Sequence, residues 1–241
     1  MEISRGHLVV KKIVDTEEGE KVERGIFKPL EFFSEGYKTI PYNEGLASII
    51  AEYYDLHVVP FTVLDYHHLI IDNQELELFG SFQDFIEKVV PLSVYKGDIV
   101  KSSATELVVL ATIICNSDVT EENILVDEDG YLYLVDNGFS LGFHHYLEIF
   151  KREEARDSQE FWEADFFNFD NTKLRFPDRV LGLMDYDYEH QLIKEIQAIP
   201  PIPANHWFGE EKEEFEEEVI GALTNRIKYL PTLVWNQYKE G

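Results

Sequence analysis

The chain has 241 residues, 44% of them hydrophobic, which is enough for a sizeable core in one large domain or in two lobes that share a cleft. Its formal net charge of −26 argues against unassisted binding to nucleic-acid phosphates or anionic membranes, because both depend on cationic side chains, and favours a basic partner instead. The single cysteine, Cys115, excludes an intrachain disulfide. The sequence shows neither a signal core nor an apolar run of membrane length, so we expect a cytoplasmic protein, with delivery into a host cell left open.

The first predicted elements are two strands and a helix. Residues 7–14 and 21–30 alternate as strands around a turn, and Lys28 lies near the end of the second strand, where a phosphate-binding lysine would be placed. A helix is predicted from Pro41, because apolar side chains recur at helical spacing up to Tyr54. Glu44 in its first turn is either a helix-start charge or the partner of an ion pair that aims Lys28.

The next segment predicts more strands and then a connection. Residues 56–64 and 75–79 read as strands, and residues 65–73 as a hairpin segment. The pair His67-His68 is interpreted as surface or packing rather than as a metal site, since no third ligand is suggested nearby. Gly80-Ser81 after a strand predicts a connector between lobes.

A helix over 99–114 leads into the most informative stretch of the chain. Residues 124–126 and 131–135 are the arms of a predicted β-hairpin, with Gly130 in the turn between them. Asp118 and Asn123 precede the first arm and Asp136 follows the second. Because a hairpin brings its outer ends together, we expect two carboxylates and an amide to converge at one edge of a sheet.

This group of side chains suits phosphoryl transfer. An Asp and an Asn carbonyl can hold Mg²⁺ on ATP phosphates, and an Asp four residues before that Asn, with the spacing D-x-x-x-x-N, can orient the attacking hydroxyl. The simpler interpretation is an acidic hairpin with surface aspartates.

Taken in order, these motifs resemble the phosphatidylinositol 3-/4-kinase-like branch of the protein-kinase-like fold, nearest the type II phosphatidylinositol 4-kinases and their small bacterial relatives. The resemblance covers roughly residues 20–142. Its segments are Gly25-Ile26-Phe27-Lys28-Pro29, Asn43-Glu44, Val59-Pro60-Phe61-Thr62-Val63, Gly80-Ser81-Phe82-Gln83-Asp84-Phe85-Ile86, Asn116-Ser117-Asp118 with Asn123, and Val135-Asp136-Asn137-Gly138.

The resemblance implies a role for each matching residue. Lys28 would contact nucleotide phosphates and Glu44 would orient it, while Asp118 would be the catalytic aspartate. Asn123 and Asp136 would bind Mg²⁺ or Mn²⁺. The adenine site would be lined by Gln83, Phe85 and Ile86.

The last third of the chain carries fewer functional signals. Residues 150–170 hold an aromatic set, interpreted as core packing or a substrate groove. Helices are predicted over 177–184, 187–198 and 208–230. The acidic run at 210–218 is either a solvated helix face or a docking surface for a basic protein.

We therefore expect an α+β, two-lobed protein-kinase-like fold. A small β-rich N-lobe would span 1–80, and a hinge at 81–87 would lead into a mostly helical C-lobe to residue 241 that contains the catalytic hairpin 116–138. The expected function is an ATP-dependent transfer of the γ-phosphoryl group to a hydroxyl, on a protein rather than a lipid. Three alternatives stay open: a pseudokinase that acts as an interaction module, an acidic inhibitor that mimics DNA, and an enzyme that transfers AMP to protein.

Overall fold

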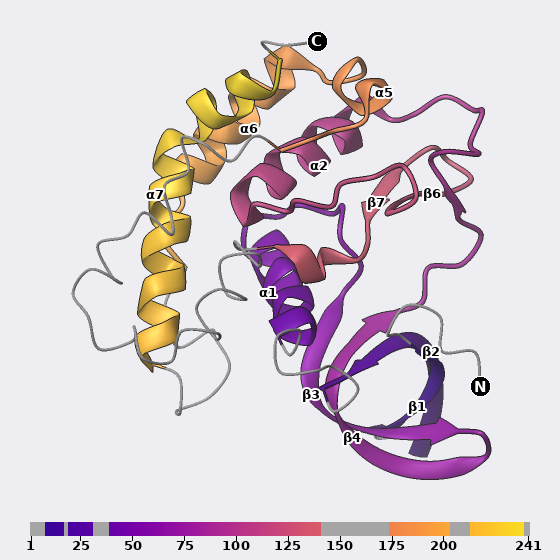
Figure 1. The fold of residues 1–241 in the computed structure, drawn as a ribbon. Helices are drawn as coiled ribbons and strands as arrows, with labels where there is room; N and C mark the ends of the chain where they lie inside the picture. The colour runs from indigo at the N-terminus through magenta and orange to yellow at the C-terminus, as the bar shows by residue number, and fades with distance from the viewer. Residues whose placement is uncertain (1–7, 17–18, 31–38, 141–173, 203–212, 239–241) are drawn as a thin grey trace.

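The computed structural model describes residues 8–16, 19–30, 39–140, 174–202 and 213–238. The chain is a mixed α+β protein, with a β-barrel at one end and most of the helices at the other (Figure 1). The aromatic segment 150–170 and the start of the acidic run, 210–212, lie outside the described residues. None of the helices in the described ranges is long and apolar enough to cross a membrane.

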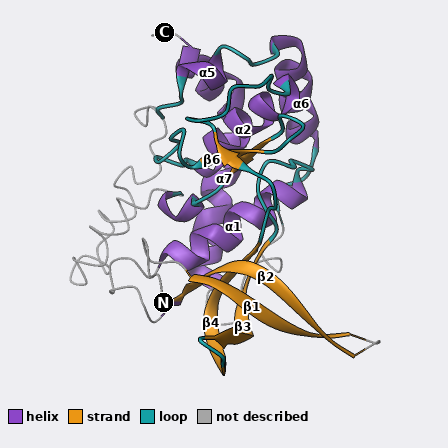
Figure 2. Ribbon diagram, turned by 90° about the vertical axis from the view of Figure 1, so that its right-hand side faces the viewer, coloured by secondary structure: helices purple, strands orange, loops and turns teal. Residues whose placement is uncertain are grey.

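Four antiparallel strands close into the barrel in the order β1-β2-β4-β3 (Figure 2). They are β1 (Leu8–Thr16), β2 (Gly19–Pro29), β3 (Thr62–Ile71) and β4 (Gln74–Asp84). Pairing of β1 with β3 closes the ring, around an apolar interior of Leu8, Val10, Phe27, Leu69 and Phe82. The turn Asp72-Asn73 has positive φ at both residues, as two-residue hairpin turns require.

The predicted connector at 81–87 is wrong in part. Gly80 to Asp84 are the last residues of β4, and they pair with β2 on one side, while Gly80 to Gln83 also pair with β3 on the other. Backbone pairing on both edges outweighs the local preference of Gly-Ser for a break. Gly80 serves a close approach instead, because a Cβ there would lie 2.3 Å from the Lys28 carbonyl oxygen. The connection between barrel and helices therefore begins at Phe85. The predicted strand 56–64 likewise begins only at Thr62.

Helix α1 (Thr39–Tyr53) lies between the barrel and the rest of the chain (Figure 1). It begins two residues before Pro41, so Glu44 lies in its second turn rather than in the predicted first turn. The predicted apolar face is confirmed, since it packs into the main core against α2. Burial of this face fixes the direction in which Asn43 and Glu44 point.

Helix α2 (Lys101–Ile114) is the centre of the main core, and its residues from Ser103 onward are all buried. It ends at the buried Cys115, which has φ 51° in the left-handed region. A small sheet lies beside it, with β5 (Val90–Pro91), β6 (Ile124–Val126) and β7 (Leu132–Leu134) in that order. The predicted hairpin is confirmed as β6 and β7, with Gly130 at φ +82° in its turn. The 3₁₀ helix η3 (Asn137–Phe139) follows β7.

Among the described residues after η3 there are three helices, α5 (Asp178–Leu181), α6 (Tyr186–Ala198) and α7 (Glu213–Tyr238). Helix α7 continues past the predicted end at 230, even though Pro231 lies inside it. Proline has no N–H, so the carbonyl of Ile227 loses its helical donor. The Gln197 side chain on α6 supplies a substitute, donating to Ile227 O at 2.9 Å.

Candidate functional site

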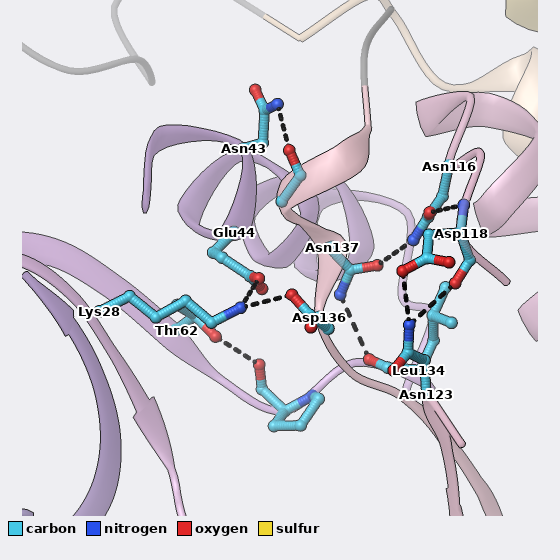
Figure 3. Close-up of polar contacts among 12 residues, drawn as sticks. Lys28, Asn43, Glu44, Thr62, Asn116, Asp118, Asn123, Leu134, Asp136 and Asn137 are labelled. Carbon is cyan, nitrogen blue, oxygen red and sulfur yellow. Dashed lines mark hydrogen bonds and ion pairs between the residues drawn. The ribbon is translucent and has the colours of Figure 1, made fainter. Parts of the chain in front are cut away.

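Lys28 is the residue on which the candidate site is built. It lies at the end of β2, is 7% exposed, and directs its ammonium group toward α1 and the segment after β7 (Figure 3). The ammonium forms an ion pair with Glu44 on α1 and a second with Asp136, where the Nζ–Oδ1 distance is 2.7 Å. Residues 28, 44 and 136 come from three separate elements. The predicted ion pair of Lys28 with Glu44 is thus present.

Burial and neighbouring charges both act on the pKa values of Lys28 and Glu44. Burial on its own lowers the pKa of the Lys28 ammonium, but Glu44 and Asp136 more than offset burial, so the pKa is raised and Lys28 is a cation. Burial raises the pKa of the Glu44 carboxyl, with the Lys28 cation opposing and the Asp136 charge adding to the rise. Two carboxylates therefore share one ammonium, which leaves an excess of negative charge.

The segment that carries Asp136 is fastened to α1. The backbone N–H of Asn137 lowers the pKa of the Glu44 carboxyl, against the rise caused by burial. The Asn43 side-chain amide donates to the carbonyl oxygens of Gly138 at 2.8 Å and Ser140 at 3.1 Å. Asp136 itself has φ 59° and ψ 57°, a left-handed conformation that turns its side chain back toward Lys28. Helix α1 thereby fixes both partners of the Lys28 ammonium.

Close packing reinforces these hydrogen bonds at Gly138. A Cβ atom added at this position would lie 2.6 Å from Ile40 Cγ2 on α1, a distance that real Cβ atoms do not show. Only glycine lets η3 approach the helix this closely.

Asp118 and Asn123 contact each other directly. The Asn123 amide donates to the Asp118 carboxylate at 2.9 Å and to its backbone carbonyl at 3.0 Å. The buried Asn116 joins this pair to the Lys28 group, because its side-chain oxygen accepts from the Asp118 N–H and its amide donates to Asn137 Oδ1 at 3.0 Å. Figure 3 shows Asp136 and Asn137 between Lys28 on one side and the Asp118–Asn123 pair on the other.

The hairpin holds these side chains as the sequence predicts. Ile124 pairs with Leu134, and the Val135 N–H donates to the Asn123 carbonyl oxygen at 2.9 Å. The outer ends of β6 and β7 are therefore adjacent. The Leu134 N–H also donates to Val58 O at 2.6 Å, which anchors β7 to the loop that follows α1.

A buried carboxylate on α2 holds the hairpin in place. Glu106 on α2 is 6% exposed and accepts hydrogen bonds from the Tyr131 hydroxyl at 3.1 Å, the Tyr188 hydroxyl at 2.9 Å and the His57 N–H at 3.2 Å. Its donors come from the hairpin, from α6 and from the loop after α1, so this one residue ties three segments to α2. Its role is structural, since it lies outside the Lys28 group.

The three residues predicted to line an adenine site come at the end of β4 and directly after it. Gln83 is buried in β4, and Phe85 and Ile86 are half-buried beyond the strand. The Arg24 guanidinium lies over the Phe85 ring at 3.9 Å from its centroid. Lys28 pairs with Ser81 on β4, and Gln83 lies two residues beyond Ser81 on the same strand. Within the described residues, no contact joins Phe85 or Ile86 to the Lys28 group.

The predicted metal ligands, Asn123 and Asp136, have the oxygen donors that Mg²⁺ prefers. The Nδ2 atom of Asn123 makes both hydrogen bonds to Asp118. The Oδ1 atom is therefore the atom of this amide that would bind a metal. The site holds three carboxylates, of Glu44, Asp136 and Asp118, against the one ammonium of Lys28, an excess of negative charge that a divalent cation would offset. The donor set therefore fits Mg²⁺ or Mn²⁺. The described residues contain no cluster of three or more His, Cys, Asp or Glu that could hold a metal by itself.

Sequence reasoning did not assign roles to several residues that assemble the site. Asn43 makes the hydrogen bonds that join α1 to η3 and the residue after it, and the bond between Asn116 and Asn137 joins the two halves of the site. Each lies one or two residues from a predicted site carboxylate in the sequence. This closeness was the available signal, but the partners of each asparagine are set by tertiary contacts between segments that lie apart in the chain.

Comparison with models of known protein families finds no match to this chain, and a search of curated proteins likewise finds no match.

Proposed function

We propose that this protein is an ATP-dependent phosphotransferase that moves the γ-phosphoryl group to a hydroxyl. The observation that carries the proposal is the Lys28 ammonium bound to both Glu44 and Asp136, with the Asp118–Asn123 pair joined to the same segment. Phosphoryl transfer needs little covalent chemistry from the protein, so a preorganised set of charges and oxygen ligands supplies most of the catalysis.

The chemistry assigns one task to each group. Lys28 would bind phosphate oxygens, with Glu44 holding its ammonium in place. Asp118 would orient the acceptor hydroxyl and take its proton as the oxygen attacks the γ-phosphorus and the bond to the ADP oxygen breaks. Asn123 and Asp136 would hold Mg²⁺ or Mn²⁺, which neutralises charge on the phosphates.

We also propose that the α+β arrangement is a two-lobed protein-kinase-like fold, with the barrel and α1 as the small lobe. The support is the order of parts along the chain: lysine strand, glutamate helix, two strands, a buried helix, and a hairpin flanked by Asp118 and Asp136. The acceptor is proposed to be a protein hydroxyl in the cytoplasm, because a net charge of −26 opposes approach to anionic lipids and favours a basic protein.

Incubation with ATP labelled at the γ-phosphate and a basic model protein tests the proposal. The wild type should transfer label, and Asp118→Asn and Lys28→Met should each lower the rate by about 10³-fold or more. Lys21→Met is the matched control, since Lys21 is an exposed lysine on the same strand and should leave the rate unchanged. Transfer of label from ATP marked at the α-phosphate would instead indicate AMP transfer, and equal rates for wild type and both site variants would refute the proposal.

A further inference from the structure

The outer edge of β4 is a surface that the candidate site does not use. Pairing of β4 with β2 ends at Gly80, which lies opposite Pro29. Residues 74–79 extend beyond this point, and among the described residues their backbone groups bond only to β3. In both ribbon views the β3–β4 hairpin points away from the helices (Figure 1, Figure 2). Because a strand directs successive backbone groups to opposite edges, alternate N–H and C=O groups of residues 74–79 are available to a further strand.

The side chains along this edge alternate between acidic and apolar. Leu76 lies directly opposite the fully buried Leu69 of β3, and Leu78 packs against the barrel core, so both belong to the inner face. Glu75 and Glu77 are exposed and belong to the outer face, because side chains alternate along a strand. Leu76 is 39% exposed even though it is on the inner face. A strand added at this edge would cover it and remove apolar surface from water.

Two aromatic rings continue the outer face beyond the carboxylates. Phe79 lies on the same face as Glu77 and opposite Tyr66 of β3, and the two ring centroids are 5.1 Å apart in an edge-on contact. Tyr66 is 65% exposed, so its ring is accessible from solvent. Aromatic rings attract cations as carboxylates do, although more weakly. The outer face of residues 75–79 therefore offers three successive positions that favour positive charge.

We propose that residues 74–79 bind an extended basic segment of a partner protein, which adds a strand to the outer edge of β4. Strand addition takes its affinity from main-chain hydrogen bonds and its specificity from alternate side chains. Residues directly opposite each other in neighbouring strands place their side chains about 5 Å apart on one face. Lysine or arginine at every second position would therefore face Glu75 and Glu77, and the apolar residues between them would cover Leu76 and Leu78. The inference goes beyond the proposed function and does not depend on it.

Charge selects a basic partner over a second copy of this chain. If two copies paired through this edge, the carboxylates of one would face either the same carboxylates or the leucines of the other, and both pairings are unfavourable. Within the chain, Glu75 contacts His68 at 3.4 Å between Oε2 and Nε2, with both side chains more than half exposed. A surface contact of this kind contributes little, so Glu75 is open to a stronger partner. The net charge of −26 adds long-range attraction for a cationic segment.

The test titrates the full chain with a fluorescent eight-residue peptide that alternates lysine and valine. The wild type should bind it with a Kd about 10-fold or more below that for the same peptide with every backbone N–H methylated. Both peptides carry the same charge, and only the first can donate the hydrogen bonds of a strand ladder, of which two are enough for this difference. Equal Kd values for the two peptides would show attraction by charge alone and would overturn the proposal.

Two double variants separate this edge from the acidic surface as a whole. Glu75→Lys with Glu77→Lys should raise the Kd for the lysine–valine peptide by about 10-fold or more, because both cross-strand charge pairs become repulsive. Glu52→Lys with Glu195→Lys is the matched control, since it changes the net charge equally at exposed positions on α1 and α6. The control should raise the Kd by less than about 3-fold. Equal increases for the two double variants would contradict the proposed place of binding.

Amide hydrogen exchange, followed residue by residue, shows where the peptide binds. Alternate N–H groups of residues 74–79 should exchange rapidly in the free protein and about 10-fold or more slowly when the peptide is saturating. Slow exchange of all these groups in the free monomer would mean that another part of the chain already covers the edge. Slow exchange that appears only as the protein dimerises would identify a second copy as the occupant. Either result would overturn the proposal, as would peptide-induced protection confined to other residues.

Discussion

The contact between Gly138 and Ile40 allows a quantitative test of how the site is assembled. Gly138→Ala would place a Cβ 2.6 Å from Ile40 Cγ2, so η3 and α1 would have to separate by about 1 Å to reach normal contact. The φ of Gly138 lies outside the left-handed region, so alanine brings no backbone strain there. Overpacking of this kind lowers the free energy of unfolding by about 1–3 kcal/mol. Alanine raises it by about 0.4–1 kcal/mol, because the unfolded chain has less conformational entropy with alanine than with glycine. The net expectation is a loss of stability.

Separation of η3 from α1 also stretches the bonds that hold the segment after Asp136 to α1, because the Asn43 amide bonds to Gly138 O and Ser140 O across the same contact. ATP affinity should therefore fall together with stability. A double-mutant cycle with Ile40→Ala isolates the cause, because this substitution removes the atom that clashes.

Urea unfolding of the wild type, both single variants and the double variant measures the coupling. Ile40→Ala alone should cost about 2–4 kcal/mol as a buried truncation, and the double variant should be more stable than the sum of the single losses by about 1–3 kcal/mol. Additive losses within about 0.5 kcal/mol would refute the claim that this close approach joins the two elements.

Two further predictions concern buried polar groups. Burial, with the nearby Lys12 charge, lowers the pKa of His67, so the folded state resists a proton that the unfolded state accepts and stability is lost as the pH falls below about 6.5. His67→Leu should therefore remove up to about 1.3 kcal/mol of the wild-type loss between pH 7.5 and 5.5 in urea unfolding, and the same change at the exposed His68 should leave that loss in place. Glu106→Leu would leave two tyrosine hydroxyls and one N–H without their acceptor and should cost about 2–4 kcal/mol in the same assay. Glu52→Leu, exposed on α1, should change stability by less than about 0.5 kcal/mol, and equal losses for the two glutamate variants would contradict the hydrogen-bond argument.

Local sequence signals predicted the parts of the fold that depend on short-range patterns. The hairpin of β6 and β7 follows from two short apolar arms around Gly130, and α2 follows from a run that is nearly all apolar. The end of β4 was not predicted, because Gly80-Ser81 favours a break locally while pairing with both neighbouring strands keeps it extended. Closure of the barrel by β1 and β3 depends on strand curvature, which leaves no mark in the sequence pattern.

The candidate site, like the fold, was predicted only in part. Lys28, Glu44 and Asp136 were named from motif order, and the ion pairs bring them together. The left-handed conformation of Asp136 could not be predicted, because aspartate adopts it only where surrounding contacts hold it. The hydrogen bonds of Asn43 and Asn116 were also beyond sequence reasoning, since their partners lie 95 and 21 residues away.

A crystal structure with Mg²⁺ and a non-hydrolysable ATP analogue tests the central claim most directly. We expect the phosphates to bind the Lys28 ammonium beside the Asp136 carboxylate, with the metal on Asn123 and Asp136 and the acceptor side of the γ-phosphate facing Asp118. Phosphates bound away from Lys28, or a nucleotide absent at saturating concentration while the Lys28–Glu44–Asp136 group is intact, would contradict it.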